Sequence, residues 1–298
     1  MRNRKSHSIL KLLREGNKFM KKVEKLYTIL IISSMIGIFI GSFWDLQINT
    51  LLYNRGSFYS ELFKTIGEIP VIFIIMLSCG MLIRLNVLEN KKLYLNLPWI
   101  VLWLLFAYTN TIPTPFYVNT IGWSFVSSSI YFILTYGIVR SIPIRDAAGI
   151  RKVAYIAILS CILSAIAVKG IKNLWGRMRY FGMVELNDFS GFSPWYIRQT
   201  MAESDMYKSF PSGHSMNASL VALCSLLPLL FVNLKKYHNQ IILGIIAWIF
   251  LVTSSRIIDG AHFISDISTG VFIGCIIQLS LIKYMFAYSN KKNTNSKI

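Results

Sequence analysis

The chain has 298 residues, of which 54% are hydrophobic and only 15% are charged, so it is too apolar for an ordinary soluble domain. Its length allows several membrane spans. A formal net charge of +18 would also suit a nucleic-acid-binding protein, but the cations follow the loops between apolar runs. We therefore predict an integral membrane protein with no nucleic-acid partner. The sequence does not indicate its oligomeric state.

Residues 1–25 form a tail rich in Lys and Arg, which favours the cytoplasmic side of a membrane. The apolar run Leu26–Phe43 follows. Because no small-residue cleavage site comes after it, we interpret this run as a retained anchor instead of a signal peptide. Residues 26–288 are predicted to form the membrane domain, and residues 289–298 a cytoplasmic tail.

Eight apolar runs are candidates for membrane-spanning helices. They are Leu26–Phe43, Ile69–Ile83, Leu97–Ile112, Gly122–Val139, Val153–Val168, Ser212–Val232, Ile241–Ser254 and Phe263–Phe286. The third is short and is broken by Pro113 and Pro115, so six spans with a re-entrant hairpin is the alternative. The predicted fold class is an all-α bundle of about eight transmembrane helices, with Asp45–Glu68 and Tyr180–Phe210 as loops.

The cations also predict how these spans are oriented. If the N-terminus is inside, the inner segments hold most of the 31 Lys and Arg residues, as the positive-inside rule demands. Both termini are then cytoplasmic. The stretches that carry reactive side chains all fall on the outer, extracytoplasmic side.

The last outer stretch places Arg256, His262 and Asp266 in otherwise apolar sequence, where ionisable groups usually mark a functional site. Asp266 follows His262 by four residues, so on one helix the carboxylate would accept a hydrogen bond from an imidazole N–H and leave the other ring nitrogen free. The Arg256 guanidinium suits a bidentate oxyanion such as phosphate. Asp259, between them, is interpreted either as tuning this site or as a solvated loop residue.

A second stretch, Pro211–His214, immediately precedes a long apolar run. The backbone N–H of Gly213 and the hydroxyl of Ser212 would then lie at a helix N-terminus, which is a ready site for an anion. The imidazole of His214 could supply a proton there.

A third stretch places the cations Lys172, Arg177 and Arg179 at the end of another apolar run. Together the three stretches resemble the signature motifs of the type 2 phosphatidic acid phosphatase superfamily, Lys-x6-Arg-Pro, Pro-Ser-Gly-His and Ser-Arg-x5-His-x3-Asp. The second and third motifs match in full, and the first matches at Lys172 and Arg179, with Tyr180 in place of the proline. The resemblance covers residues 150–288, and all three motifs in order make it specific.

This resemblance implies a mechanism that needs no metal and no cofactor. His262 would attack phosphorus and form a phosphohistidine, Asp266 would hold its tautomer, and His214 would protonate the departing oxygen and later activate water. The groups that would hold the phosphoryl oxygens are Lys172, Arg179, Arg256, Ser212 and Gly213. The sequence agrees, because it has no carboxylate cluster suited to magnesium and its four cysteines all lie within apolar runs.

Three functional classes remain open. The first is a phosphatase that acts on a lipid phosphomonoester or diphosphate in the cell membrane, and phosphatidate, phosphatidylglycerol phosphate, diacylglycerol pyrophosphate and polyprenyl diphosphate all fit. The second is a membrane acyl hydrolase that uses Ser212 or Ser215 with His262 and Asp266, which leaves the three cations without a role. The third is a non-catalytic protein that binds or transports a lipid phosphate. Vanadate-dependent haloperoxidases belong to the same superfamily but are soluble.

Overall fold

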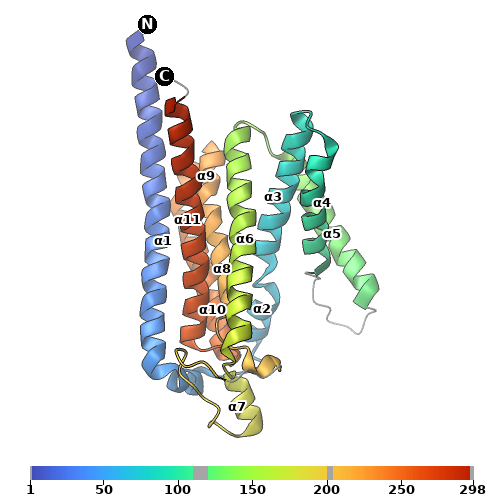
Figure 1. Ribbon diagram of the computed structural model, residues 1–298, viewed down its shortest axis with the longest axis vertical. Helices are drawn as coiled ribbons and strands as arrows, with labels where there is room; N and C mark the ends of the chain where they lie inside the picture. Colours follow the sequence, from blue (N-terminus) through green and yellow to red (C-terminus); the bar gives the residue numbers. More distant parts are fainter. Residues whose placement is uncertain (1, 110–119, 200–203, 296–298) are drawn as a thin grey trace.

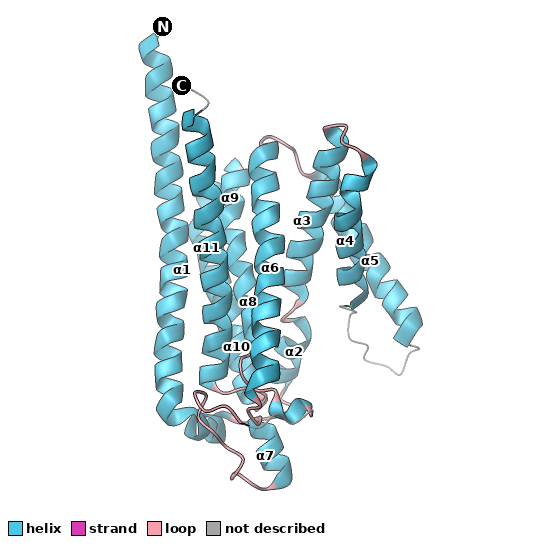
Figure 2. Ribbon diagram, in the orientation of Figure 1, coloured by secondary structure: helices cyan, strands magenta, loops and turns pink. Residues whose placement is uncertain are grey.

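The computed structural model describes residues 2–109, 120–199 and 204–295, and within these ranges the chain is helical and has no strand (Figure 2). The longer helices are α1 (Arg2–Leu52), α3 (Ile69–Leu88), α5 (Thr120–Ser141), α6 (Ala147–Trp175), α10 (His238–Ile258) and α11 (Ile264–Asn295). The shorter ones are α2 (Phe58–Ile66), α4 (Leu97–Thr109), α7 (Tyr180–Leu186), α8 (Gly213–Ser219) and α9 (Leu227–Leu230). Four 3₁₀ turns complete the set, η1 (Leu93–Asn96), η2 (Asp205–Tyr207), η3 (Leu220–Leu226) and η4 (Val232–Tyr237).

The prediction of an all-α, multi-pass membrane protein is confirmed. Among the described residues, 6 helical stretches are long and apolar enough to cross a membrane. They are Phe19–Leu52, Phe58–Leu88, Ala147–Leu186, Gly213–Leu230, Val232–Ile258 and Ile264–Ala287. The third and fourth predicted runs correspond to α4 and α5, which pack on α3 at one side of the bundle (Figure 1). The predicted break at Pro113 and Pro115 lies outside the described residues.

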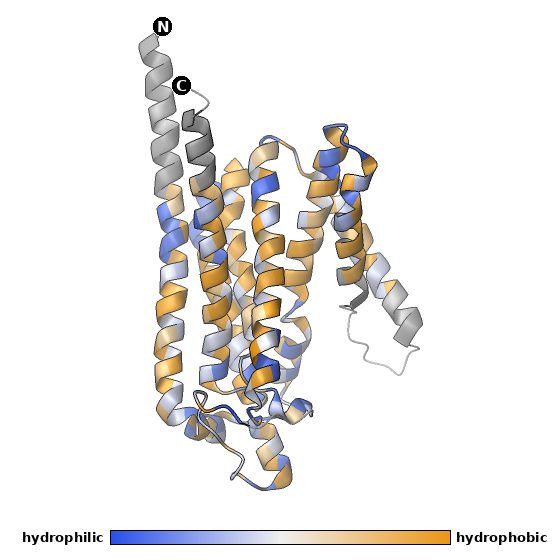
Figure 3. Cartoon of the chain, viewed as in Figure 1, coloured by the Kyte–Doolittle hydropathy of each residue, from blue (hydrophilic) through white to orange (hydrophobic). Residues whose placement is uncertain are grey.

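The outer faces of the helices are apolar, as a hydrocarbon environment requires. Phe39 of α1 is 65% exposed and Phe250 of α10 is 67% exposed, although both are large hydrophobic side chains. In Figure 3 hydrophobic residues cover the length of the helices, and hydrophilic ones gather toward their ends. A contiguous apolar exterior of this kind marks the lipid-facing surface of a membrane domain.

Helices α1 and α11 lie side by side along the bundle (Figure 1). The hydroxyl of Tyr27 donates to Oε1 of Gln278 at 2.9 Å inside this interface. Lower down, Gly37 and Gly41 bring the two backbones together, because a Cβ at Gly41 would lie 2.8 Å from the backbone nitrogen of Ser265. Small residues at a spacing of four are a usual means of close helix packing in membranes.

The predicted loop Asp45–Glu68 is wrong, because α1 continues through Leu52 and α2 follows directly. The loop was predicted because the stretch from Asp45 to Glu68 is more polar than the apolar runs on either side. In the structure Asp45 is 1% exposed and its charge is compensated by Arg177 at 2.8 Å, so the helix does not need to end there. The chain turns only after Leu52, at the same end of the bundle as α7 (Figure 1).

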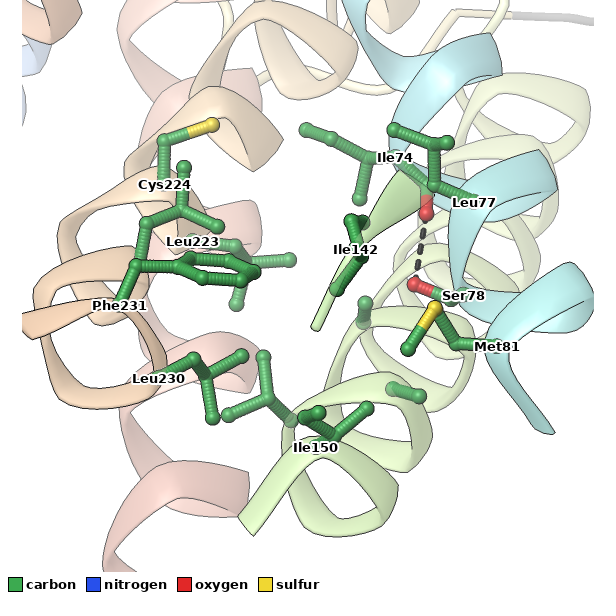
Figure 4. Close-up of a pocket in the computed structure, with 14 residues that line it drawn as sticks. Ile74, Leu77, Ser78, Met81, Ile142, Ile150, Leu223, Cys224, Leu230 and Phe231 are labelled. Atoms are coloured by element: carbon green, nitrogen blue, oxygen red, sulfur yellow. Dashed lines mark hydrogen bonds between the residues drawn. The ribbon is translucent and has the colours of Figure 1, made fainter. Parts of the chain in front are cut away.

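A cavity of about 170 Å³ lies between α3, α6 and the segment from η3 to Phe231 (Figure 4). Its lining is apolar apart from Ser78, whose hydroxyl donates to the carbonyl of Ile74 at 2.6 Å. Ile142 and Ile150, which flank the α5–α6 connection, close it at the end of the bundle where α6 begins. The thiol of Cys224 also lines the cavity, but none of the motif residues does, and those lie at the opposite end of the bundle.

Candidate active site

Backbone hydrogen bonds join the three motif-bearing stretches at the end of the bundle where α6 and α10 finish and α8 and α11 begin (Figure 1). The N–H of Ser212 donates to the carbonyl of Asp266 at 3.0 Å. On the other side, the N–H of Arg179 donates to Met206 at 2.8 Å, and the N–H of Phe181 donates to Gly260 at 3.0 Å. These hydrogen bonds hold segments that are far apart in the sequence next to one another at this end of the bundle.

His262 lies in the turn between α10 and α11 and is 2% exposed. Its Nδ1 is 2.6 Å from the carbonyl oxygen of Ser209. A carbonyl can only accept, so Nδ1 carries the proton and Nε2 keeps a free lone pair. Burial, together with the charges of Lys172 and Arg179, holds the pKa of His262 well below its ordinary value, so the ring is neutral and nucleophilic at neutral pH.

The predicted direct hydrogen bond from His262 to Asp266 is absent. Nδ1 is 3.9 Å from Oδ2 of Asp266, because His262 precedes the start of α11 at Ile264 and the two residues do not share a helical face. Asp266 Oδ2 instead accepts from the hydroxyl of Ser209 at 2.5 Å and from the N–H of Phe263 at 2.8 Å. Ser209 therefore links the two residues, because its hydroxyl donates to Asp266 and its carbonyl accepts the Nδ1 proton of His262.

His214 is the second residue of α8, and its side chain is 31% exposed. Its Nε2 is 3.8 Å from Oε1 of Glu68, which also accepts a hydrogen bond from Asn217 at 2.9 Å. Glu68 immediately precedes α3. Glu68 lies far from the motifs in sequence, at the boundary of an apolar run, so no motif points to it.

The predicted cations Lys172, Arg179 and Arg256 are brought together, since all three interact electrostatically with His214. Arg256 is 3% exposed, and its Nη2 donates to Asp259 at 2.7 Å. Its buried Nε and Nη1 have no acceptor within the described residues, and neither does Nε of Arg179. Buried N–H groups without acceptors are costly, and an anionic ligand would supply the acceptors.

Ser212 and Gly213 form the start of α8. The Ser212 side chain is fully buried and accepts from the N–H and the hydroxyl of Ser215, at 3.3 and 2.9 Å. Ser212 thus caps its own helix, and its hydroxyl proton remains available to a ligand. A Cβ built on Gly213 would meet no atom within 4 Å, so there is open space beside this backbone.

The structure adds a buried ion-pair network that the motifs do not contain. Arg177 is 0% exposed and pairs with Asp45 at 2.8 Å and with Asp266 at 2.5 Å. Asn49, also on α1, donates to the carbonyl of His262 at 3.1 Å. Arg177 and Asp259 both lie in buried ion pairs, so the interpretation of Asp259 as a solvated loop residue is wrong. Asp45 was not predicted as a site residue. The signal that could have identified it is its position as an ionisable residue at the edge of an apolar run.

Among the described residues, no group of three or more His, Cys, Asp or Glu side chains is arranged to hold a metal ion. Two carboxylates of the site are instead occupied by arginines, Asp266 by Arg177 and Asp259 by Arg256.

The motif-bearing part of the chain is similar to a known family, the PAP2 superfamily. Residues 153–290 match the model of that family, and they contain all three motif-bearing stretches. Asp45, Asn49 and Glu68 lie outside the matched segment.

Two curated relatives are similar to parts of this chain. Phosphatidylglycerophosphatase B of Bacillus subtilis is 40% identical over 73 residues, which is 23% of this chain and 35% of that protein. Lipid A 4'-phosphatase of Porphyromonas gingivalis is 27% identical over 175 residues, which is 58% of this chain and 66% of that protein. No solved structure shows significant similarity to the chain.

Proposed function

We propose that the protein is a lipid phosphate phosphatase that works through a phosphohistidine. The observation that carries this proposal is the combination of a neutral, buried histidine with a free Nε2 and buried arginine N–H groups without acceptors. Arg256 and Arg179 supply those donors. Among the described residues, Lys172 is affected by burial and by nearby charges but has no hydrogen-bond partner. A phosphoryl group would satisfy all three cations.

In the first step the Nε2 lone pair of His262 attacks phosphorus, and the bond from phosphorus to the lipid oxygen breaks. His214 donates a proton to that oxygen, so the lipid leaves as an alcohol, or as a monophosphate if the substrate is a diphosphate. In the second step His214 accepts a proton from water, which attacks the phosphohistidine and releases inorganic phosphate. Lys172, Arg179 and Arg256 stabilise the charge on the phosphoryl oxygens throughout.

The substrate class follows from where the site lies. It sits at the end of an apolar bundle, beside helices that a lipid tail can approach, so the phosphoryl group is presented at headgroup level. The names of both relatives describe enzymes that act on lipids carrying a phosphate, which supports the same class here. Phosphatidate, phosphatidylglycerol phosphate, diacylglycerol pyrophosphate and polyprenyl diphosphate remain the candidates, and the positive-inside rule favours the extracytoplasmic face.

The acyl hydrolase alternative is less well supported. Ser215 donates its hydroxyl to Ser212 at 2.9 Å, and His262 is held by the carbonyl of Ser209, so the described residues form no serine–histidine pair of the kind that activates a nucleophile. A binding or transport protein would need the cations but not a histidine with a free lone pair.

The test is phosphate release by the purified protein in detergent from a panel of the four candidate lipids. Rapid quenching during turnover of a lipid labelled in its phosphate should trap an acid-labile phosphoprotein in the wild type and none in His262→Asn. His238→Asn is the matched control, because His238 is also buried but lies at the start of α10, at the far end of the bundle. Tight binding without phosphate release would leave only the binding protein, and release of fatty acid would favour the acyl hydrolase.

A further inference from the structure

We propose that Asp45 and Arg177 are positioning residues of the phosphatase reaction, and that α1 thereby supplies a functional part of the site from outside the family-matched segment. This inference rests on the proposed function of His262 as nucleophile. It assigns a role to an N-terminal helix that would otherwise be regarded as a membrane anchor.

The guanidinium of Arg177 is held on all sides within the protein. Nη2 donates to Asp45 at 2.8 Å, Nη1 donates to Asp266 at 2.5 Å and to the hydroxyl of Ser265 at 2.8 Å, and Nε donates to the carbonyl of Ser193 at 3.0 Å. The side chains of Arg177, Asp45 and Asp266 are all 0% exposed. Each charge in this group is therefore compensated by its ion-pair and hydrogen-bond partners and not by water.

Asp45 also fixes the first turn of α11. Its Oδ1 accepts from the N–H of Ser265 at 3.0 Å, and its Oδ2 is hydrogen-bonded to the Ser265 hydroxyl. Ser265 directly precedes Asp266 in the chain. Asp45 therefore restrains Asp266 twice, once through Arg177 and once through the adjoining backbone.

The network reaches His262 in two further contacts. Asp266 Oδ2 accepts from the Ser209 hydroxyl at 2.5 Å, and the Ser209 carbonyl accepts the Nδ1 proton of His262 at 2.6 Å. A change in the position or charge of Asp266 is thus passed to the residue that sets the ring orientation. On the opposite side, Asn49 of α1 donates to the His262 carbonyl at 3.1 Å.

Charge balance gives this network a role beyond holding the fold together. Two carboxylates and one guanidinium carry a net charge of about −1. Attack on phosphorus places positive charge on the His262 ring, and a net negative network behind the ring stabilises that charge. Without the Asp45 charge, Arg177 would cancel the charge of Asp266 and the network would be neutral.

The other charges near His262 are fixed contributions that the test leaves in place. They come from Lys172 in the last turn of α6, Arg179 after α6, and Arg256 with Asp259 at the end of α10. His214 and Glu68 complete the charged and titratable groups on the α8 and α3 side.

The experiment compares Asp45→Asn, Arg177→Gln and the double variant, each purified in detergent and assayed for lipid phosphate hydrolysis over pH. Asp45→Asn makes the network neutral, so we expect kcat to fall by about tenfold with little change in KM, and the acidic limb of kcat/KM to move to lower pH. Arg177→Gln makes the network more negative, so its acidic limb should move to higher pH. The double variant restores a charge of about −1, so its limb should return toward the wild-type position.

A purely structural role predicts different results. The two single variants would then lose activity and thermal stability together, with unshifted pH limbs, and the double variant would be no better than either. That outcome overturns the proposal. Glu89→Gln, which breaks an ion pair with Arg151 at the far end of the bundle, is the control for loss of a carboxylate.

Two further outcomes are informative. If one single variant does not fold, the folded double variant is compared with the other single variant. A pH dependence like that of the wild type, with a kcat above that of the single variant, supports the proposal. An acidic limb that does not differ from that of the single variant, with no recovery of kcat, overturns it. If the double variant does not fold either, the purely structural role is established. Wild-type kcat in Asp45→Asn also overturns the proposal, while inactivity of His262→Asn in the same assay would leave the proposed function intact.

Discussion

The carbonyl oxygen of Ser209 lies 2.6 Å from Nδ1 of His262, and the hydroxyl of the same serine donates to Asp266 at 2.5 Å. One residue therefore links the predicted nucleophile to the carboxylate that the sequence paired with it directly. The backbone carbonyl selects the tautomer, and the side chain ties that carbonyl to the position of Asp266.

Ser209→Ala tests this division of labour. The variant keeps the carbonyl that accepts the His262 proton and removes only the hydroxyl that donates to Asp266. We expect kcat to fall by about tenfold, in line with the loss of one bond from a buried network, whereas His262→Asn should be inactive. The measurement is lipid phosphate hydrolysis beside a thermal unfolding scan. Inactivity of Ser209→Ala in a fully folded protein would contradict the idea that the carbonyl orients the ring.

The pKa of His262 predicts how stability changes with pH. Burial lowers it well below the ordinary value, so on acidification the unfolded chain takes up a proton near pH 6.5, while the folded protein does not. Above about pH 6.5 the ionisation of His262 therefore does not lower the free energy of unfolding. Below that pH the free energy of unfolding falls by about 1.4 kcal/mol per pH unit, until the pKa of His262 in the folded protein is reached. His262→Asn should lose less thermal stability than the wild type between about pH 7.5 and about pH 5.5. Equal losses would show that His262 is not buried as a neutral ring.

Arg256 should contribute to the reaction and not merely to the membrane boundary. Its Nε and Nη1 are buried without an acceptor in the described residues, so they are preorganised donors for a phosphoryl oxygen. Arg256→Ala should lower kcat/KM by at least about 100-fold, the scale for losing one preorganised donor. Arg140→Ala is the control, because Arg140 is exposed at the end of α5. If both substitutions lowered kcat/KM by a similar, small factor, Arg256 would be assigned to the membrane interface and not to the reaction.

The motifs predicted the members of the site but not the contacts between them. Lys172, Arg179 and Arg256 were predicted from the resemblance of the three stretches to the family's signature motifs, and the structure brings them near His214. The His262–Asp266 contact was mispredicted because the spacing rule assumes a helix, and α11 begins only at Ile264.

Long-range pairing explains what the sequence could not predict. Asp45 looked like the end of a span because its partner, Arg177, is 132 positions away in the chain. No local pattern can show that a buried carboxylate is compensated by a distant cation. The apolar runs, by contrast, depend only on local composition, and they predicted the long helices but not the short helices α2 and α7, which lie in the two predicted loops.

Glu68 should act on the leaving group through His214. Its carboxylate lies 3.8 Å from Nε2 of that histidine, where it favours the protonated ring that must donate to the departing oxygen. Glu68→Gln should lower kcat for a lipid phosphate by about tenfold. An aryl phosphate, whose leaving group needs no proton, should be affected much less. Glu185→Gln is the control, since Glu185 pairs with Arg55. Equal losses on both substrates would place Glu68 outside the proton transfer.

Vanadate and a chelator separate the proposed mechanism from metal-assisted hydrolysis. A vanadate ion bonded to Nε2 of His262 would have five oxygen and nitrogen ligands around vanadium, as phosphorus has in the in-line transition state, and the three cations would hold its oxygens. Vanadate should therefore inhibit competitively with the lipid phosphate, and His262→Asn should lose the ability to bind it. EDTA should leave the activity unchanged, because lysine and arginine side chains perform the charge stabilisation that magnesium would otherwise provide. Activity that is lost in EDTA, regained with magnesium and insensitive to vanadate would contradict the histidine mechanism.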